Sequence, residues 1–173
     1  MDARWTKKND ESFFGYKNHI NADEQNKLIQ AYEVTDASVH DSRVIDELLD
    51  HAETPEGKKR PVYADSAYRS EEREAELARQ GLRSEIHEKG ARNHPLTDEQ
   101  KASNRVKSKV RARVEHIFGA QAQRGGHWVR TIGLARAQVK IGMMNLVYNM
   151  GRLGQLLKRD GKAHNGKGAP VMA

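Results

Sequence analysis

Residues 13–35 read FFGYKNHINADEQNKLIQAYEVT, and this stretch decides the first part of the fold. Two runs rich in aromatic and β-forming residues, 13–22 and 28–35, flank the polar segment DEQNK. Two such runs joined by a short polar segment predict an antiparallel β-hairpin.

A helix and a buried strand are predicted after the hairpin. The pair Asp41-Ser42 offers an N-cap for a helix that runs to Leu49. The apolar run PVYA at residues 61–64 ends abruptly at Asp65, and a run bounded in this way suits a buried strand. Asp65 is therefore expected at the carboxyl end of a strand, where open α/β sheets place their sites.

Caps and periodicity predict the remaining elements. Ser70 is expected to cap a helix that ends at Gly81, and a short strand is expected over residues 82–87. Two longer helices are expected over residues 98–118 and 133–157. Their apolar residues recur at helical spacing and are expected to face the core: Val106, Val110, Val114 and Phe118 in the first helix, and Val139, Met143, Leu146, Met150 and Leu153 in the second.

This order of elements predicts a mixed α/β fold over residues 1–157, with a sheet that is antiparallel at its start. Residues 158–173 are Gly-rich and polar, and they are expected to form a disordered basic tail. The chain has no cysteine, which excludes disulfides and thiolate zinc sites. It also has no long apolar run and no signal-like N-terminus, so a cytoplasmic location is expected and no membrane partner.

Charge is divided unevenly along the chain. Residues 1–88 hold 13 Lys/Arg against 20 Asp/Glu, whereas residues 89–173 hold 17 Lys/Arg against 4 Asp/Glu. A half-chain as basic as the second favours a polyanion partner, most often nucleic acid. The alternative is a solvated, soluble surface.

Two acids stand out against this background. Glu115 follows the stretch 105–113, which holds five cations and no carboxylate. Taken singly, Asp65 is better explained by an Asx turn and Glu115 by an ion pair with Arg111. Taken together, the two acids suggest a pair of carboxylates that faces a phosphodiester and binds Mg²⁺. The expected DNA-binding residues are Arg105, Lys107, Lys109, Arg111, Arg113, Arg130, Arg136 and Lys140.

Several motifs together resemble one family. They are YADSAYR at residues 63–69, RARVEH at 111–116, FGYKNH at 14–19, VHDS at 39–42 and TIGLAR at 131–136. These motifs resemble the DDE transposases of bacterial insertion sequences, in the group typified by insertion sequence five. The resemblance extends over residues 1–157.

The resemblance implies a ribonuclease-H-like mixed sheet flanked by helices, in which three acids bind two Mg²⁺ or Mn²⁺ ions. Asp65 corresponds to the second acid and Glu115 to the third, and Arg111 matches a family arginine that would hold a DNA phosphate. The implied activity is hydrolysis and strand transfer at transposon ends, with double-stranded DNA as partner, in the cytoplasm at the bacterial nucleoid. The family often carries a lysine two helical turns after the glutamate, where this chain has Ala122.

The family's first acid lies upstream of the segment that matches Asp2-Ala-Arg-Trp5, so this sequence is expected to lack it, and Asp2 and Asp23 are not equivalent replacements. Activity is therefore open: the chain is either an enzyme or a DNA-binding remnant without catalysis. Self-association or an N-terminal partner fragment could supply the missing part. A structure-selective nuclease of the same fold would fit the carboxylates but not the motifs.

Overall fold

The computed structural model describes residues 2–8, 10–49, 57–91, 94–126 and 128–165 of the chain. It has a mixed α/β composition and divides into two compact units, which we describe separately. Unit 1 contains Met1–Ala37 and Ile117–Ala173, and unit 2 contains Ser38–His116. None of the helices in the described part of the chain has the length and hydrophobicity needed to cross a membrane.

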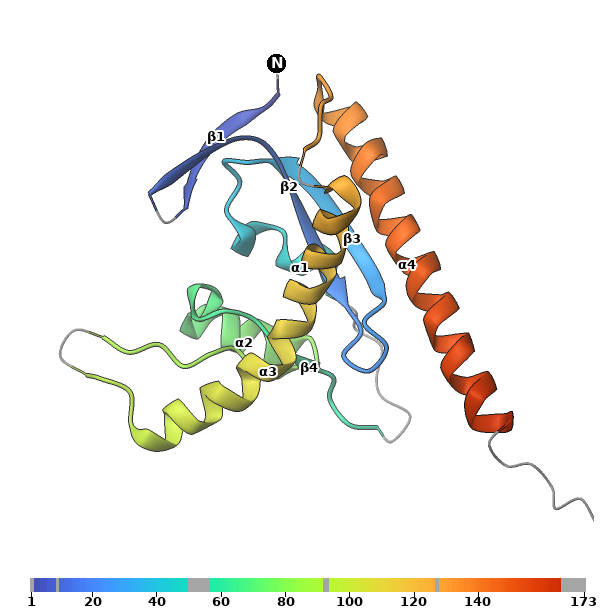
Figure 1. The fold of residues 1–173 in the computed structure, drawn as a ribbon. Coiled ribbons are helices and arrows are strands. Elements are labelled where there is room, and N and C mark those ends of the chain that lie inside the picture. Colours follow the sequence, from blue (N-terminus) through green and yellow to red (C-terminus); the bar gives the residue numbers. More distant parts are fainter. Residues whose placement is uncertain (1, 9, 50–56, 92–93, 127, 166–173) are drawn as a thin grey trace, which may run out of the picture. The chain divides into compact units, whose positions relative to one another are not determined.

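Unit 1 is built on an antiparallel sheet of three strands in the order β1-β2-β3 (Figure 1). The strands are β1 (Arg4–Lys8), β2 (Glu11–Ala22) and β3 (Ile29–Asp36). The predicted hairpin is confirmed as β2 and β3. The sequence did not predict β1, which pairs with the first part of β2 and contacts it through the rings of Trp5 and Phe14, with centroids 5.1 Å apart.

Asp23 makes the turn between β2 and β3. Its carboxylate accepts hydrogen bonds from the backbone N–H groups of Gln25 (3.2 Å) and Asn26 (2.6 Å), which is an Asx-type turn. Lys27 completes the turn with a positive φ of 57°. These bonds explain why the polar segment DEQNK reverses the chain.

Helix α4 (Leu134–Asn165) lies along β3 in unit 1 (Figure 1). Its first turn is capped by Asp2, whose Oδ2 accepts a hydrogen bond from Leu134 N at 3.0 Å. The Asn149 side chain of α4 holds the first residue of β3, because its Oδ1 accepts a hydrogen bond from Ile29 N (2.9 Å) and its Nδ2 donates to Ile29 O (2.8 Å). The helix is longer than predicted, so residues 158–165, which we expected to be disordered, are helical; residues 166–173 lie outside the described part.

The apolar stripe predicted to be the core face of α4 is exposed. Its five members, Val139, Met143, Leu146, Met150 and Leu153, are each at least half exposed. The buried face lies about two positions away and contains Ala137, Ile141, Asn145, Tyr148 and Leu156. The prediction was wrong because polar side chains on this face have hydrogen-bonding partners that local periodicity does not reveal.

Asn145 is the most informative of these polar side chains, being only 2 % exposed. Its Oδ1 accepts hydrogen bonds from Asn18 Nδ2 (2.9 Å) and Gln121 Nε2 (2.8 Å), and its Nδ2 donates to Asn18 Oδ1 (3.2 Å). The nearby apolar core of unit 1 consists of Ile29, Ile117 and Tyr148. A satisfied amide network therefore joins β2 to the two helices beside this core.

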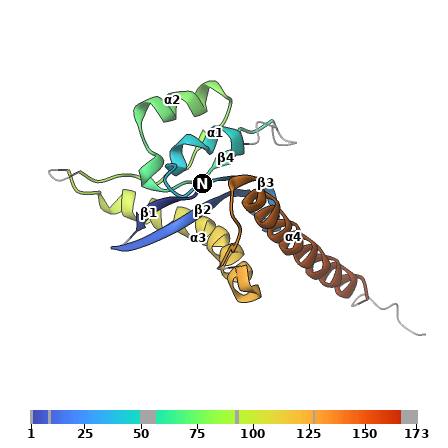
Figure 2. The same ribbon diagram turned by 90° about the horizontal axis from the view of Figure 1, so that it is seen from above.

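Unit 2 contains a two-stranded parallel sheet with short helices grouped around it (Figure 2). Ile86, Leu77 and Leu82 form its core. Its elements before the long helix are the 3₁₀ turn η1 (Asp41–Arg43), α1 (Ile45–Leu48), β4 (Pro61–Val62), the 3₁₀ turn η2 (Ser66–Tyr68), α2 (Glu71–Arg79) and β5 (Arg83–Ser84).

The caps in unit 2 follow the sequence signals in part. Ser70 caps α2 by accepting a hydrogen bond from Arg73 N at 3.1 Å, as predicted. Gly81 follows α2 with a φ of 73°, which also agrees with the prediction. The expected cap at Asp41 was wrong, because the His40 side chain accepts the bond from Ser42 N.

Helix α3 (Asp98–Gln121) begins at a reciprocal cap. Gln100 N donates to Thr97 Oγ1, and Thr97 N donates to Gln100 Oε1, which is a capping box. A short π-helical turn (Ala122–Gly126) follows the helix. The buried stripe predicted for α3 is wrong at two of its four positions: Val106 is 61 % exposed and Phe118 is 38 % exposed, whereas Val110 and Val114 are partly buried. The buried positions of α3 are Lys107, Ile117 and Gln121.

Substitution of Asn145 by alanine is expected to lower the free energy of unfolding by about 1–3 kcal/mol, because it removes the hydrogen-bonding partner of the buried Gln121 amide and of the partly buried Asn18 amide. Urea unfolding measures this change. Gln138→Ala, at an exposed position of the same helix, is the control and should change stability by less than about 0.5 kcal/mol. Equal effects of the two substitutions would show that the Asn145 network does not stabilise unit 1.

Candidate functional site

The parallel pair β4–β5 determines where the site of unit 2 lies. Beyond the two paired residues of each strand, the ladder continues through Glu85 N to Val62 O (2.9 Å) and His87 N to Ala64 O (3.2 Å). Asp65 and His87 therefore follow the carboxyl ends of neighbouring parallel strands. This edge is where α/β sheets place ligands, as the sequence predicted for Asp65.

Asp65 has one structural contact and one long-range contact. Its Oδ1 caps the turn η2 by accepting hydrogen bonds from Ser66 N (2.6 Å) and Ser66 Oγ (3.3 Å). Its Oδ2 accepts from Arg111 Nη2 on α3 at 3.2 Å. The side chain is 49 % exposed, so the carboxylate remains open to solvent. Asp65 therefore has a local structural role, although its side chain caps the turn through the next residue, Ser66, rather than through the residue two positions on as in the expected Asx turn.

The surroundings of Asp65 keep its carboxyl group ionised. Partial burial raises its pKa, but the Arg111 guanidinium and the hydrogen bonds from Ser66 together lower the pKa by more, so the net shift is downward. A carboxylate that stays charged near neutral pH is what a cation site requires.

Arg111 connects the strand end to the helix. The ion pair that the structure gives it is with Asp65, rather than with Glu115 as one interpretation of the sequence proposed. Its Nη1 lies 3.3 Å from His87 Nδ1. The Arg111 side chain is 30 % exposed, so it is accessible to solvent in part.

Glu115 is exposed and lies four residues after Arg111 on α3. Residues four apart share a helix face, so Glu115 follows Arg111 by one turn on the side from which Arg111 reaches Asp65. Arg111 and Glu115 therefore share one face of α3, and Asp65 is joined to this face through its ion pair with Arg111.

The donor chemistry of Asp65 and Glu115 suits a hard divalent cation, because Mg²⁺ and Mn²⁺ prefer carboxylate oxygens. Asp65 is open to solvent and ionised, which fits such a role. Among the residues that the structure describes, no group of three or more His, Asp or Glu side chains is arranged to hold a metal ion. The carboxylates of Asp65 and Glu115 are of the type that a divalent-cation site uses.

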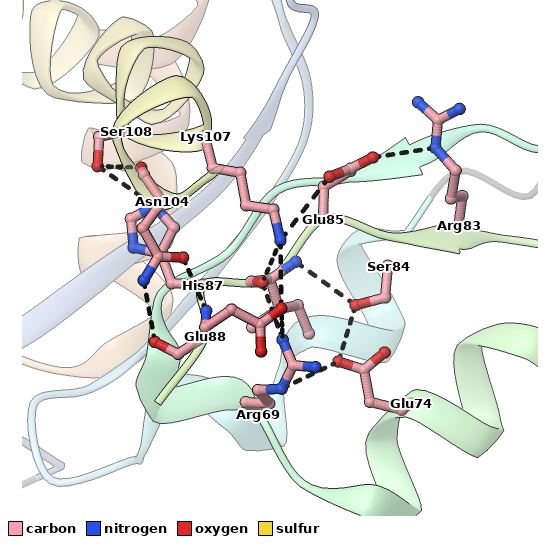
Figure 3. Close-up of polar contacts among 11 residues, drawn as sticks. Arg69, Glu74, Arg83, Ser84, Glu85, His87, Glu88, Asn104, Lys107 and Ser108 are labelled. Carbon is pink, nitrogen blue, oxygen red and sulfur yellow. Dashed lines mark hydrogen bonds and ion pairs between the residues drawn. The ribbon is translucent and has the colours of Figure 1, made fainter. Parts of the chain in front are cut away.

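Lys107 does not fit the DNA-binding role predicted for it. The residue is 8 % exposed, and its Nζ donates to Ile86 O at 3.0 Å inside unit 2 (Figure 3). Glu88 and Glu85 lie 3.7 and 3.9 Å from the same ammonium group. Arg69 also donates to Ile86 O and pairs with Glu88 at 2.8 Å. Lys107 therefore forms hydrogen bonds and ion pairs inside unit 2, and its burial contradicts the expected contact with a DNA phosphate.

The other predicted cations remain accessible to different degrees. Arg105 and Lys109 are exposed one turn apart on α3, and Arg113 is partly buried. In unit 1, Arg130 precedes α4, while Arg136 and Lys140 lie in its first turns, and all three are exposed.

Sequence reasoning missed two polar residues beside Asp65. His87 is 9 % exposed, and burial, Arg111 and Lys107 lower its pKa against the opposing effect of Asp65. Burial and the charges of Asp41 and Asp65 raise the pKa of Tyr68, which also hydrogen-bonds Asp41. The available signal for His87 was its position as the last residue of a predicted strand, next to the strand that ends at Asp65.

Comparison with known proteins agrees on one family. Residues 1–150 match the family described as transposase DDE domain. The chain is also 38 % identical over 118 residues to the transposase for insertion sequence element IS1106 of Neisseria meningitidis serogroup B. That alignment covers 68 % of this chain and 39 % of the relative, so the chain spans well under half of the relative's length. No solved structure matches the chain at a significant level.

The substitution Lys107→Ala is expected to lower the free energy of unfolding by about 1–3 kcal/mol, because Glu85 and Glu88 lose the buried ammonium group between them. Lys109→Ala removes the same charge from an exposed position and should cost less than about 0.5 kcal/mol. Denaturant unfolding compares the two variants. Similar stabilities would contradict the interior role of Lys107.

His87 is expected to make stability depend on pH. Its pKa in the folded chain lies below the ordinary value of 6.5, so the unfolded chain binds a proton at higher pH than the folded chain does. The stabilisation is therefore complete above about pH 6.5 and is lost as pH falls through the lower folded pKa. Unfolding free energies measured at about pH 7.5 and 5.5 should fall more steeply for the unaltered chain than for His87→Asn. Parallel pH profiles would contradict this expectation.

Proposed function

This chain belongs to the transposase DDE domain family, and we propose that it acts in DNA transposition through Asp65, Arg111 and Glu115. The observation that carries the proposal is the Asp65–Arg111 ion pair at the carboxyl end of β4, with Glu115 one helical turn further along α3. The proposed reaction is phosphodiester hydrolysis at a transposon end followed by strand transfer to target DNA. This reaction would take place at the bacterial nucleoid in the cytoplasm, where the DNA substrate lies.

Asp65 and Glu115 are the residues that would hold Mg²⁺ or Mn²⁺. A pair of such ions supplies an activated attacking oxygen and stabilises the leaving oxygen. Asp65 contributes an ionised carboxylate whose Oδ1 is fixed by Ser66, so its Oδ2 has a defined direction. Arg111 would neutralise a phosphate oxygen of the DNA beside this carboxylate.

The family's fold is ribonuclease-H-like, and we propose that fold for this chain. Its support here is the mixed α/β composition, the antiparallel strands β1, β2 and β3, and an acid at the end of a parallel strand. The long helix that carries Glu115 follows the strands β1 to β5 along the chain.

Besides Arg111, DNA contacts are proposed for the predicted cations that are exposed or partly exposed, which leaves out buried Lys107. On α3 these are Arg105 and Lys109, with partly buried Arg113 on the same side of the helix. In unit 1 they are Arg130, Arg136 and Lys140. Contacts from such side chains to phosphates position a protein on DNA without reading its sequence.

A second candidate function is DNA binding without cleavage. It is favoured by the absence, among the described residues, of a group of three or more side chains that could hold a metal ion. The two candidates share the DNA surface and differ in the chemistry of the acidic site.

A nicking assay on duplex DNA carrying the ends of the insertion element, with Mg²⁺ or Mn²⁺, separates the candidates. Asp65→Asn and Glu115→Gln are each expected to reduce nicking by more than about 100-fold, since even groups behind metal ligands commonly contribute 10–100-fold. Glu99→Gln changes an exposed acid in the first turn of the same helix and should leave nicking unchanged. Binding by the unaltered chain without metal-dependent nicking would support the second candidate.

DNA affinity is expected to fall with salt concentration, with a log–log slope of about −0.9 for each neutralised phosphate. Arg105→Ala and Lys109→Ala should each reduce the steepness of this slope by about 0.9, because each exposed cation contacts one phosphate. Fluorescence anisotropy over a salt series measures the slope. Lys107→Ala is the buried control, and a change in slope as large as that of Lys109→Ala would contradict the proposed surface.

A further inference from the structure

His87 has a contact pattern that the proposed chemistry does not use. The ring is almost completely buried and lies against α3. Its Nδ1 is 3.3 Å from Arg111 Nη1, and its Nε2 is 3.3 Å from Ser108 Oγ. Ser108 Oγ in turn donates to the backbone oxygen of Asn104 at 2.8 Å (Figure 3). The ring therefore connects the guanidinium of the acidic site to the backbone of α3.

The hydrogen-bond donors along this path determine where the His87 proton lies. A guanidinium has donors and no acceptor, so the contact with Arg111 requires an unprotonated Nδ1. The single ring proton then lies on Nε2 and points to Ser108 Oγ, which accepts it and donates its own proton to Asn104 O. Each donor on this path has one acceptor, and only this tautomer satisfies all three contacts.

The charged groups around the ring also favour its neutral form. Arg111 and Lys107 approach from α3, and the opposing charge is Asp65 at the end of β4. Protonation of the ring would place a positive charge at hydrogen-bond distance from the Arg111 guanidinium and would remove the acceptor on Nδ1.

We propose that His87 is a positioning residue: its neutral ring accepts a hydrogen bond from Arg111 Nη1 and thereby orients the guanidinium so that Nη2 meets Asp65 Oδ2. The inference rests on the proposed function only in assigning Asp65 and Arg111 to the site. Arg111 has five N–H donors, and these two bonds fix the guanidinium plane while leaving N–H groups for a phosphate of DNA. Without an acceptor at His87, the guanidinium could rotate away from the carboxylate.

Nitrogen NMR of the full chain at about pH 7.5 tests the tautomer directly. We expect His87 to show a protonated Nε2 and an unprotonated Nδ1. Protonation at Nδ1, or on both nitrogens, would overturn the proposal. This measurement needs neither DNA nor metal, so its outcome is separate from the success or failure of the nicking assay.

Two variants test the positioning role. Asparagine carries an acceptor near the position of Nδ1, whereas glutamine extends to the position of Nε2, so His87→Asn keeps the bond to Arg111 and His87→Gln keeps only the bond to Ser108. The unaltered chain and His87→Asn should show two separate Nη resonances for Arg111, and His87→Gln should show one averaged resonance. Separate resonances in His87→Gln would contradict the proposal.

DNA binding provides the functional measurement. His87→Gln is expected to weaken duplex binding several-fold at low salt, and His87→Asn is expected to restore affinity to within about twofold of the unaltered chain. Urea unfolding confirms that both variants are folded, and the tautomer measurement on the unaltered chain does not depend on them. If the unaltered chain fails to bind or nick DNA while Arg111 and His87 show the expected signals, the proposed function fails and the positioning contact stands.

Discussion

One polar face of α3 holds the backbone and side chains of residues 86–88, and the candidate site depends on this contact. Four residues of this face recur at helical spacing, and each contacts a different backbone or side-chain group of residues 86–88. They are Asn104, Lys107, Ser108 and Arg111. Asn104 pairs with both the N–H and the carbonyl of Glu88, at 2.8 and 3.1 Å. Because the segment that follows β5 is fixed in this way, Arg111 meets Asp65 at the end of the neighbouring strand.

Lys107 and Arg111 illustrate how one helical turn changes the role of a cation. Lys107 points at Ile86 O in the interior, where its charge is matched by two glutamates and contributes to the fold. Arg111 lies at the edge of the same interface and reaches an exposed carboxylate. A planar guanidinium can bond His87 and Asp65 at once and still have donors to spare, which an ammonium group on the same stem would do less well.

Local sequence signals predicted where the helices and strands lie better than they predicted which faces of the helices are buried. The hairpin, the strand end at Asp65 and the caps at Ser70 and Gly81 depend on residues close in sequence, and all four are observed. The buried faces of α3 and α4 were mispredicted because apolar spacing was the only available guide. Polar residues at the buried positions, such as Lys107 and Asn145, are stabilised by partners more than 20 residues away.

The register of β4 with β5 positions the site residues, and it could not be predicted from the sequence. Pro61 pairs with Arg83 and Val62 with Ser84, and the same offset places His87 opposite Asp65, with His87 N donating to Ala64 O. A shift of one residue would bring Glu88 to that position instead, and a second carboxylate would raise the pKa of Asp65 rather than leave it lowered. Strand register therefore contributes to the lowered pKa of Asp65, beside the larger effects of the Arg111 guanidinium and the hydrogen bonds from Ser66. Ile86, the residue before His87, anchors this segment, because its side chain is fully buried in the core of unit 2 and its carbonyl accepts a hydrogen bond from Lys107.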